Sequence, residues 1–183
     1  MSENEEFVFD ETEVIKRAVR EGACAEEEAD LFLTREFEYL AAKGLIADAP
    51  PETEETDEPV CLNDDEQFLF FHKTTGLSAE KITALMQIER KIMLEGGIIN
   101  YDSEEDILNE VTFTEQDIPC LEEIYDFSYI MKSISYMYRN GIILDRNIAT
   151  AEEWDARARR EGWDDTKPFV YMERAPLPLR KSE

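Results

Sequence analysis

Three stretches of this sequence carry apolar residues at helical spacing and end in a glycine followed by two aliphatic residues. The endings are Gly44-Leu45-Ile46, Gly97-Ile98-Ile99 and Gly141-Ile142-Ile143. Glycine directly after a helical pattern is typical of a helix C-terminus, because glycine adopts the left-handed conformation needed there at little cost. A recurring ending of this kind favours a fold built from similar helical units.

Apolar periodicity predicts where the helices of these units lie. Ser78 has the residue type and the position of an N-cap for one of them. The expected helices of the first two units cover residues 11–20, 25–43, 64–73 and 79–95. The third unit is expected to contain a helix that begins at 114–117 and ends at Asn140-Gly141. A C-terminal helix is expected to begin at a capping box of residues 150–153 and to end at 161, before Gly162.

The first two units look like copies of one another. Aligning their endings without gaps pairs Phe32 with Leu85 and Glu36 with Glu89. The matched glutamates make this likeness more specific than apolar spacing alone. The third unit is a more diverged copy.

We therefore predict a mainly α protein with two or three helix-turn-helix-like repeats and minor β structure. Residues 110–113 are expected to form a short wing-like strand, and residues 169–172 a C-terminal strand or a docking segment. The predicted boundaries are 1–48 for the first repeat, 49–63 for an acidic proline-containing linker, 64–101 for the second repeat, 102–146 for the diverged third repeat, and 147–183 for a C-terminal helix and extended tail.

Charge is the most unusual property of the composition. The 183 residues include 44 acidic and 19 basic ones, a formal net charge of -25. Ten Phe, seven Tyr and two Trp in patterned segments indicate a folded chain rather than a disordered one. The electrostatic field of this net negative charge repels nucleic acid and anionic membranes and attracts cationic partners. The alternative is that the charge serves solubility only.

Several features predict a cytoplasmic protein without a membrane span. Residues 1–6 have neither the basic nor the apolar region of a signal peptide. No apolar run approaches the roughly 20 residues that a span needs. Cys24, Cys61 and Cys120 lie far apart and are expected to be free thiols in a reducing compartment.

The sequence gives little sign of catalysis. Its single histidine, His72, falls in an aromatic segment and is expected to pack in the core. The densest carboxylates, at 64–66, and the acidic run 102–106 lack the spacing of a metal site. We expect a protein that is not an enzyme and that has no catalytic residues, no metal and no cofactor.

The stretch from Thr75-Gly76-Leu77-Ser78 to Gly97-Ile98-Ile99 resembles the core of winged-helix proteins. In that family the second helix reads the DNA major groove, which requires basic and amide side chains. The equivalent helix of the first repeat opens instead with acidic residues, so DNA binding through this face is not expected. Weak DNA binding through the arginine-containing tail stays open.

Size, charge and helix-turn-helix remnants together resemble the acidic anti-CRISPR proteins of bacterial mobile elements. The resemblance implies an inhibitor that occupies a basic nucleic-acid channel by DNA mimicry, with the Cas9–guide RNA complex as the suspected partner. The alternative is an adaptor that joins another protein, or a second copy of itself, through apolar surfaces. The residues expected to bind the partner are Glu26, Glu27, Glu28, Asp30, Asp57, Glu58, Asp64, Asp65 and Glu66.

Overall fold

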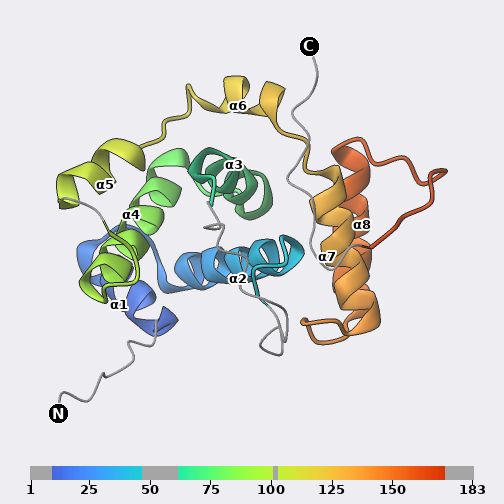
Figure 1. The fold of residues 1–183 in the computed structure, drawn as a ribbon, viewed down its shortest axis with the longest axis horizontal. Helices are drawn as coiled ribbons and strands as arrows, with labels where there is room; N and C mark the ends of the chain where they lie inside the picture. The colour runs from blue at the N-terminus through green and yellow to red at the C-terminus, as the bar shows by residue number, and fades with distance from the viewer. Residues whose placement is uncertain (1–9, 47–61, 101–102, 172–183) are drawn as a thin grey trace. The chain divides into compact units, whose positions relative to one another are not determined.

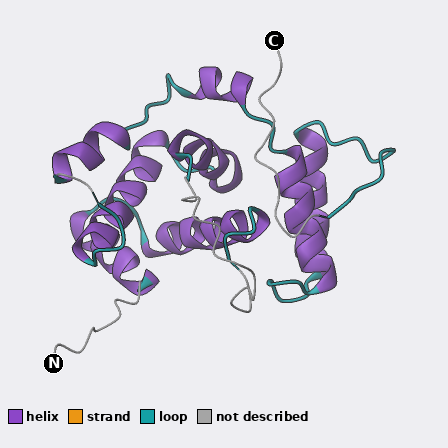
Figure 2. Cartoon of the chain, in the orientation of Figure 1, coloured by secondary structure: helices purple, strands orange, loops and turns teal. Residues whose placement is uncertain are grey.

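The structure is a computed structural model that describes residues 10–46, 62–100 and 103–171 (Figure 1). Within these residues it has eight helices and no strand (Figure 2), which confirms the mainly α prediction. The helices are α1 (Glu11–Glu21), α2 (Glu26–Ala42), α3 (Asp64–Thr75), α4 (Ala79–Glu95), α5 (Glu104–Glu110), α6 (Ile118–Ile124), α7 (Ser128–Asn140) and α8 (Ile148–Arg160).

The predicted minor β structure is wrong for the described residues. Glu110 ends α5, and the extended residues 111–113 bond to side chains of α4 rather than to another strand. The backbone carbonyl of Val170 accepts from the hydroxyl of Tyr129. Because side chains bond these extended segments, no ladder of backbone bonds forms, and a strand requires one. Residue 172 lies outside the described residues.

Helix boundaries follow the prediction most closely where a cap is clear in the sequence. Helix α4 has the predicted bounds, and the Ser78 side chain accepts from the Lys81 amide. The single helix expected between 114 and 140 is two helices, α6 and α7, and the Asp126 carboxylate accepts from the Ser128 amide where α7 begins. Helix α8 is capped by Asn147, ahead of the predicted capping box.

The glycine endings have a common geometry. Gly44, Gly97 and Gly141 have φ of 70°, 69° and 66°, all left-handed. In each case the amide after the glycine bonds back to the last helical turn, as from Ile98 to the Met93 carbonyl at 2.9 Å. This is the Schellman pattern of helix termination. The recurring sequence feature therefore marks three helix ends.

Contacts divide the chain into two compact units. Unit 1 comprises 1–34 and 67–118, and unit 2 comprises 35–66 and 119–183, so α2, α3 and α6 contribute residues to both. These units group the chain differently from the predicted repeats, whose boundaries stay a prediction.

Unit 1 is organised around α4, which contacts α1 and α5. Its core is aromatic: the rings of Phe32 and Phe71 lie 4.3 Å apart between centroids, and those of Phe68 and Phe113 lie 4.4 Å apart. Burial of these large rings stabilises the unit by removing apolar surface from water.

Unit 2 is organised around the pairing of α7 with α8. The carboxylate of Asp155 on α8 accepts from Lys132 and Arg139 of α7, each at 2.7 Å. Trp154 beside it is fully buried. These contacts hold the two helices against each other.

Candidate acidic interaction surface

The acidic first turn of α2 is exposed except at one position. Glu26, Glu27 and Asp30 are exposed, whereas Glu28 is half-buried. Both carboxylate oxygens of Glu28 contact Lys81 Nζ, at 2.6 and 2.8 Å. One oxygen also accepts from the Ala25 amide, so Glu28 stabilises the helix start. The hydrogen bond from Lys81 lowers the pKa of Glu28.

The second predicted acidic group does not form one surface. Asp57 and Glu58 lie outside the described residues. Asp65 is exposed and Asp64 is half-buried at the start of α3. Glu66 is only 2% exposed, and in unit 2 it forms an internal cluster with residues of α2 and the turn after it.

Glu66 has two partners in that cluster. Its Oε1 lies 2.6 Å from Lys43 Nζ and accepts from the Tyr39 hydroxyl. Burial lowers the pKa of Lys43, while the bond to Glu66 opposes that effect. A carboxylate enclosed in this way supports the interior of unit 2 rather than presenting charge to a partner.

Three segments that lie far apart in the sequence meet at the start of α4. The Glu28–Lys81 pair joins the first turn of α2 to it. The Ala79 amide donates to Glu115 Oε1 at 2.8 Å, and this bond joins the turn before α6 to the start of α4. The exposed carboxylates from these segments form what we call the α4 acidic rim: Glu26, Glu27, Glu80 and Glu115.

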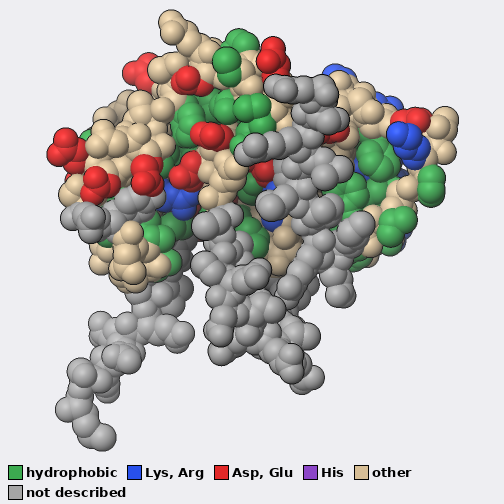
Figure 3. Space-filling view, turned by 45° about the horizontal axis from the view of Figure 1, so that its top comes forward, with side chains coloured by type: hydrophobic (Ala, Val, Ile, Leu, Met, Phe, Trp, Pro, Cys, Tyr) green, Lys and Arg blue, Asp and Glu red, His purple; other side chains and the backbone are tan. Residues whose placement is uncertain are grey.

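Sequence reasoning considered the acidic run 102–106 only as a metal site and did not include the acidic residues beyond α4 in the partner-binding surface. Between Lys91 and Lys132 the sequence holds no lysine, arginine or histidine. This stretch includes α5, whose Glu104, Glu105 and Glu110 are exposed. Figure 3 shows Asp and Glu side chains spread over the left-hand part of the molecule, where α5 lies, with few basic groups among them. The absence of basic residues was the sequence signal that could have located this surface.

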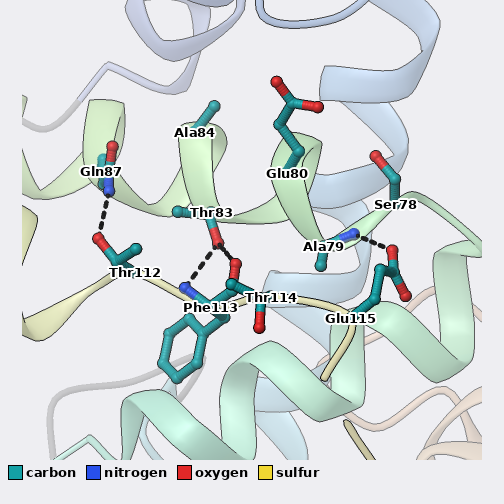
Figure 4. A pocket seen from close by; sticks show the side chains of 10 residues that line it. All are labelled: Ser78, Ala79, Glu80, Thr83, Ala84, Gln87, Thr112, Phe113, Thr114 and Glu115. Atoms are coloured by element: carbon teal, nitrogen blue, oxygen red, sulfur yellow. Dashed lines mark hydrogen bonds between the residues drawn. The ribbon is translucent and has the colours of Figure 1, made fainter. Parts of the chain in front are cut away.

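A groove runs along α4 beside residues 112–115 (Figure 4). Its volume is about 630 Å³, and the residues that line it are mainly small, hydroxylic or apolar. They include Ser78, Glu80, Ala84, Gln87, Phe113 and Glu115. The groove lies entirely within unit 1.

Side chains of α4 hold residues 111–113 along this groove. Thr83 Oγ1 donates to the Phe113 carbonyl and accepts from the Phe113 amide, both at 3.1 Å. Gln87 Nε2 donates to the Val111 carbonyl at 2.6 Å. Figure 4 shows the bonds between Thr83 and Phe113, and a bond from Gln87 Nε2 to Thr112 Oγ1, along one side of α4. Glu80 and Ala84 point away from that side.

Two arginines of the arginine-containing C-terminal part contact other residues of unit 2. Arg157 lies over the Trp154 ring, with Cζ 4.7 Å from the ring centre, and burial lowers its pKa. Arg159 Nε donates to Asp165 at 2.6 Å. Arg160 is exposed, and residues 174, 180 and 181 lie outside the described part of the chain.

His72 is a packed residue of α3. Its Nδ1 lies 3.1 Å from the Leu77 carbonyl, and its ring stacks near Phe68. In the described ranges, no group of three or more His, Cys, Asp or Glu side chains is arranged to hold a metal ion. Cys24 and Cys120 are unbonded thiols, and Cys61 lies outside those ranges.

None of the helices in the described ranges is long and apolar enough to cross a bilayer. Comparisons of the chain with protein-family models, with curated proteins and with solved structures find no match.

Proposed function

We propose that this chain is a non-enzymatic inhibitor that acts in the cytoplasm by binding a cationic surface of a nucleic-acid-binding protein. The observation that carries the proposal is the meeting of acidic segments around the start of α4. Carboxylates from α2, α4 and the turn at 115 gather there, and Lys81 in the first turn of α4 is paired with Glu28. Phosphates of duplex DNA present a comparable density of negative charge to such a partner.

The same geometry argues against α4 as a helix that reads DNA. Base recognition needs free amide or basic side chains on the exposed face of the helix. Gln87 donates to the Val111 carbonyl, and Lys81 contacts both oxygens of Glu28. Glu80 would meet the phosphates at close range, where like charges repel.

The partner to test first is the Cas9–guide RNA complex. RNA-guided nucleases hold nucleic acid in a positively charged channel, which an acidic surface can occupy in place of DNA. Size, charge and helical content are what this chain has in common with inhibitors of such nucleases. The proposal expects that the chain blocks either the binding of target DNA by the Cas9–guide RNA complex or its cleavage of that DNA.

The experiment compares two matched triple variants. E26Q/E27Q/E80Q removes three charges at the α4 acidic rim, and D145N/E152Q/E153Q removes three exposed charges of unit 2. Binding to purified Cas9–guide RNA and cleavage of target DNA are measured at 50 and 300 mM salt. The proposal expects salt-sensitive binding that the first variant weakens and the second preserves. Absence of binding by the unmodified chain would overturn the choice of partner, and equal loss in both variants would overturn the choice of surface.

A second candidate function rests on the aromatic surface of unit 2. Phe169 lies against Tyr129, Tyr136 and Trp163, with ring centroids 5.4 to 5.7 Å apart. Val170 beside it is 62% exposed. Such a surface suits an adaptor that joins another protein or a second copy of the chain. Association that persists at high salt and is lost in a Val170→Asp variant would favour this function.

A further inference from the structure

We infer that the groove along α4 beside residues 112–115 receives an extended segment of the partner that carries lysine or arginine among apolar residues. This inference rests on the proposed function for the cationic nature of the partner. It adds the place at which a partner backbone enters and the sequence type it has there.

The shape and lining of the groove suit an extended segment. Its volume of about 630 Å³ lies within the roughly 300–1,000 Å³ of pockets that enclose ligands. Ala79 and Phe113 are buried beneath it, while Ala84 is partly exposed along it. The small Ala84 side chain leaves room for apolar side chains of a partner, and their burial supplies the affinity that charge alone does not.

Residues 111–113 show that α4 can hold an extended chain. Thr83 satisfies both backbone groups of Phe113, and Gln87 satisfies the carbonyl of Val111. These bonds fix one wall of the groove. A fixed wall lowers the ordering cost of binding, since less of the site must be immobilised when a partner enters.

The charge of the groove selects a basic segment. Glu80 and Glu115 are exposed among the residues that line it, and none of those residues is basic. Lys81 is held by Glu28, so it does not neutralise them. The positive end of the α4 dipole is offset because Ser78 accepts from the Lys81 amide and Glu115 accepts from the Ala79 amide.

The test uses three capped heptapeptides and the full chain. One peptide alternates valine with lysine, the second alternates serine with lysine, and the third alternates valine with glutamate. Backbone amide shifts are followed by NMR during titration at low salt. The inference expects the valine–lysine peptide to shift amides of 79–87 and 112–115, and the other two to bind at least tenfold more weakly, roughly 1.4 kcal/mol.

Matched substitutions separate the groove from general charge attraction. Ala84→Trp fills the groove without changing charge, and Ala149→Trp places the same side chain at an exposed position of α8. We expect the first to weaken binding of the valine–lysine peptide at least tenfold and the second to leave it unchanged. Circular dichroism verifies that both variants are folded.

The outcomes distinguish this inference from the proposed function. Equal binding of the three peptides, shifts located elsewhere, or unchanged binding by folded Ala84→Trp would each overturn the groove as the docking site. If E26Q/E27Q/E80Q still weakens binding to Cas9–guide RNA in that case, the proposed function stands without the groove. Groove binding of the valine–lysine peptide without any binding of Cas9–guide RNA would overturn the proposed partner alone.

Discussion

Lys81 Nζ lies 2.6 and 2.8 Å from the two carboxylate oxygens of Glu28, and this ion pair joins the start of α4 to the start of α2. Lys81 is thereby paired with Glu28, while Glu26, Glu27 and Glu80 are exposed beside this pair. This one ion pair therefore connects two helices of unit 1, and its cation neutralises Glu28 rather than the exposed carboxylates beside it.

The first prediction concerns the pH dependence of this pair. Because Lys81 lowers the pKa of Glu28, the stabilisation is present above the pKa of Glu28 in the unfolded chain and is lost as pH falls through the folded value. Carboxyl carbon NMR should show Glu28 titrating below its ordinary range, and Lys81→Met should raise that pKa. A pKa that Lys81→Met does not change would contradict the role of the pair.

The second prediction tests a helix ending. Gly97 has φ of 69° with open space around its Cα, so Gly97→Ala is strained by its backbone and not by a clash. We expect it to lower the free energy of unfolding by about 1 kcal/mol. Gly96, with φ of -80°, is the control, and Gly96→Ala should be neutral or slightly stabilising. Urea unfolding measures both, and equal effects would refute the assignment.

The third prediction concerns the buried carboxylate of Glu38 in unit 2. Glu38 is 1% exposed and accepts from Arg35 at 2.7 Å, from Tyr138 at 2.5 Å and from Trp154 Nε1 at 3.3 Å. Glu38→Ala leaves the Arg35 charge enclosed without its partner and should destabilise the protein by about 3–5 kcal/mol. Trp154→Phe, which removes one hydrogen bond and some packing, should destabilise it less. Thermal unfolding ranks the two, and a stable Glu38→Ala variant would contradict this account.

The fourth prediction is a double-substitution cycle at Lys43 and Glu66. Each single change, Lys43→Met or Glu66→Gln, removes one member of a pair whose nitrogen and oxygen lie 2.6 Å apart in a buried setting. Each should destabilise unit 2 by about 3 kcal/mol, and the double variant by less than the sum. Unfolding by urea gives the coupling energy. Strict additivity would show that the two groups do not act as a pair.

The fifth prediction concerns the wall of the groove. Thr83→Val keeps the shape of the side chain and removes both hydrogen bonds to Phe113. We expect faster hydrogen exchange at residues 112–115 and a loss of stability of about 1–3 kcal/mol. Thr34→Val on the exposed face of α2 is the control, and its hydroxyl bonds only to a helical carbonyl. Unchanged exchange at 112–115 would mean that Thr83 does not hold this segment.

Much of the helical architecture was predictable because its signals are local. The bounds of α4 follow from the serine before it and from the apolar spacing within it. The three glycine endings follow from the left-handed conformation that only glycine adopts freely. Helix α5 was missed because its acidic sequence has little apolar periodicity. The break before α7 was missed because Ile124 and Phe127 keep helical spacing across Asp126, so the apolar pattern shows no interruption there.

The sequence by itself determined a mainly helical chain, its principal helix ends and its large excess of negative charge. Only the tertiary structure decided which acidic side chains are exposed. Glu26 and Glu66 look alike in sequence, each in an acidic first turn, yet the first is exposed and the second is enclosed with Lys43 and Tyr39. The reason is that burial and ion pairing depend on residues brought together from distant segments, which local patterns do not specify.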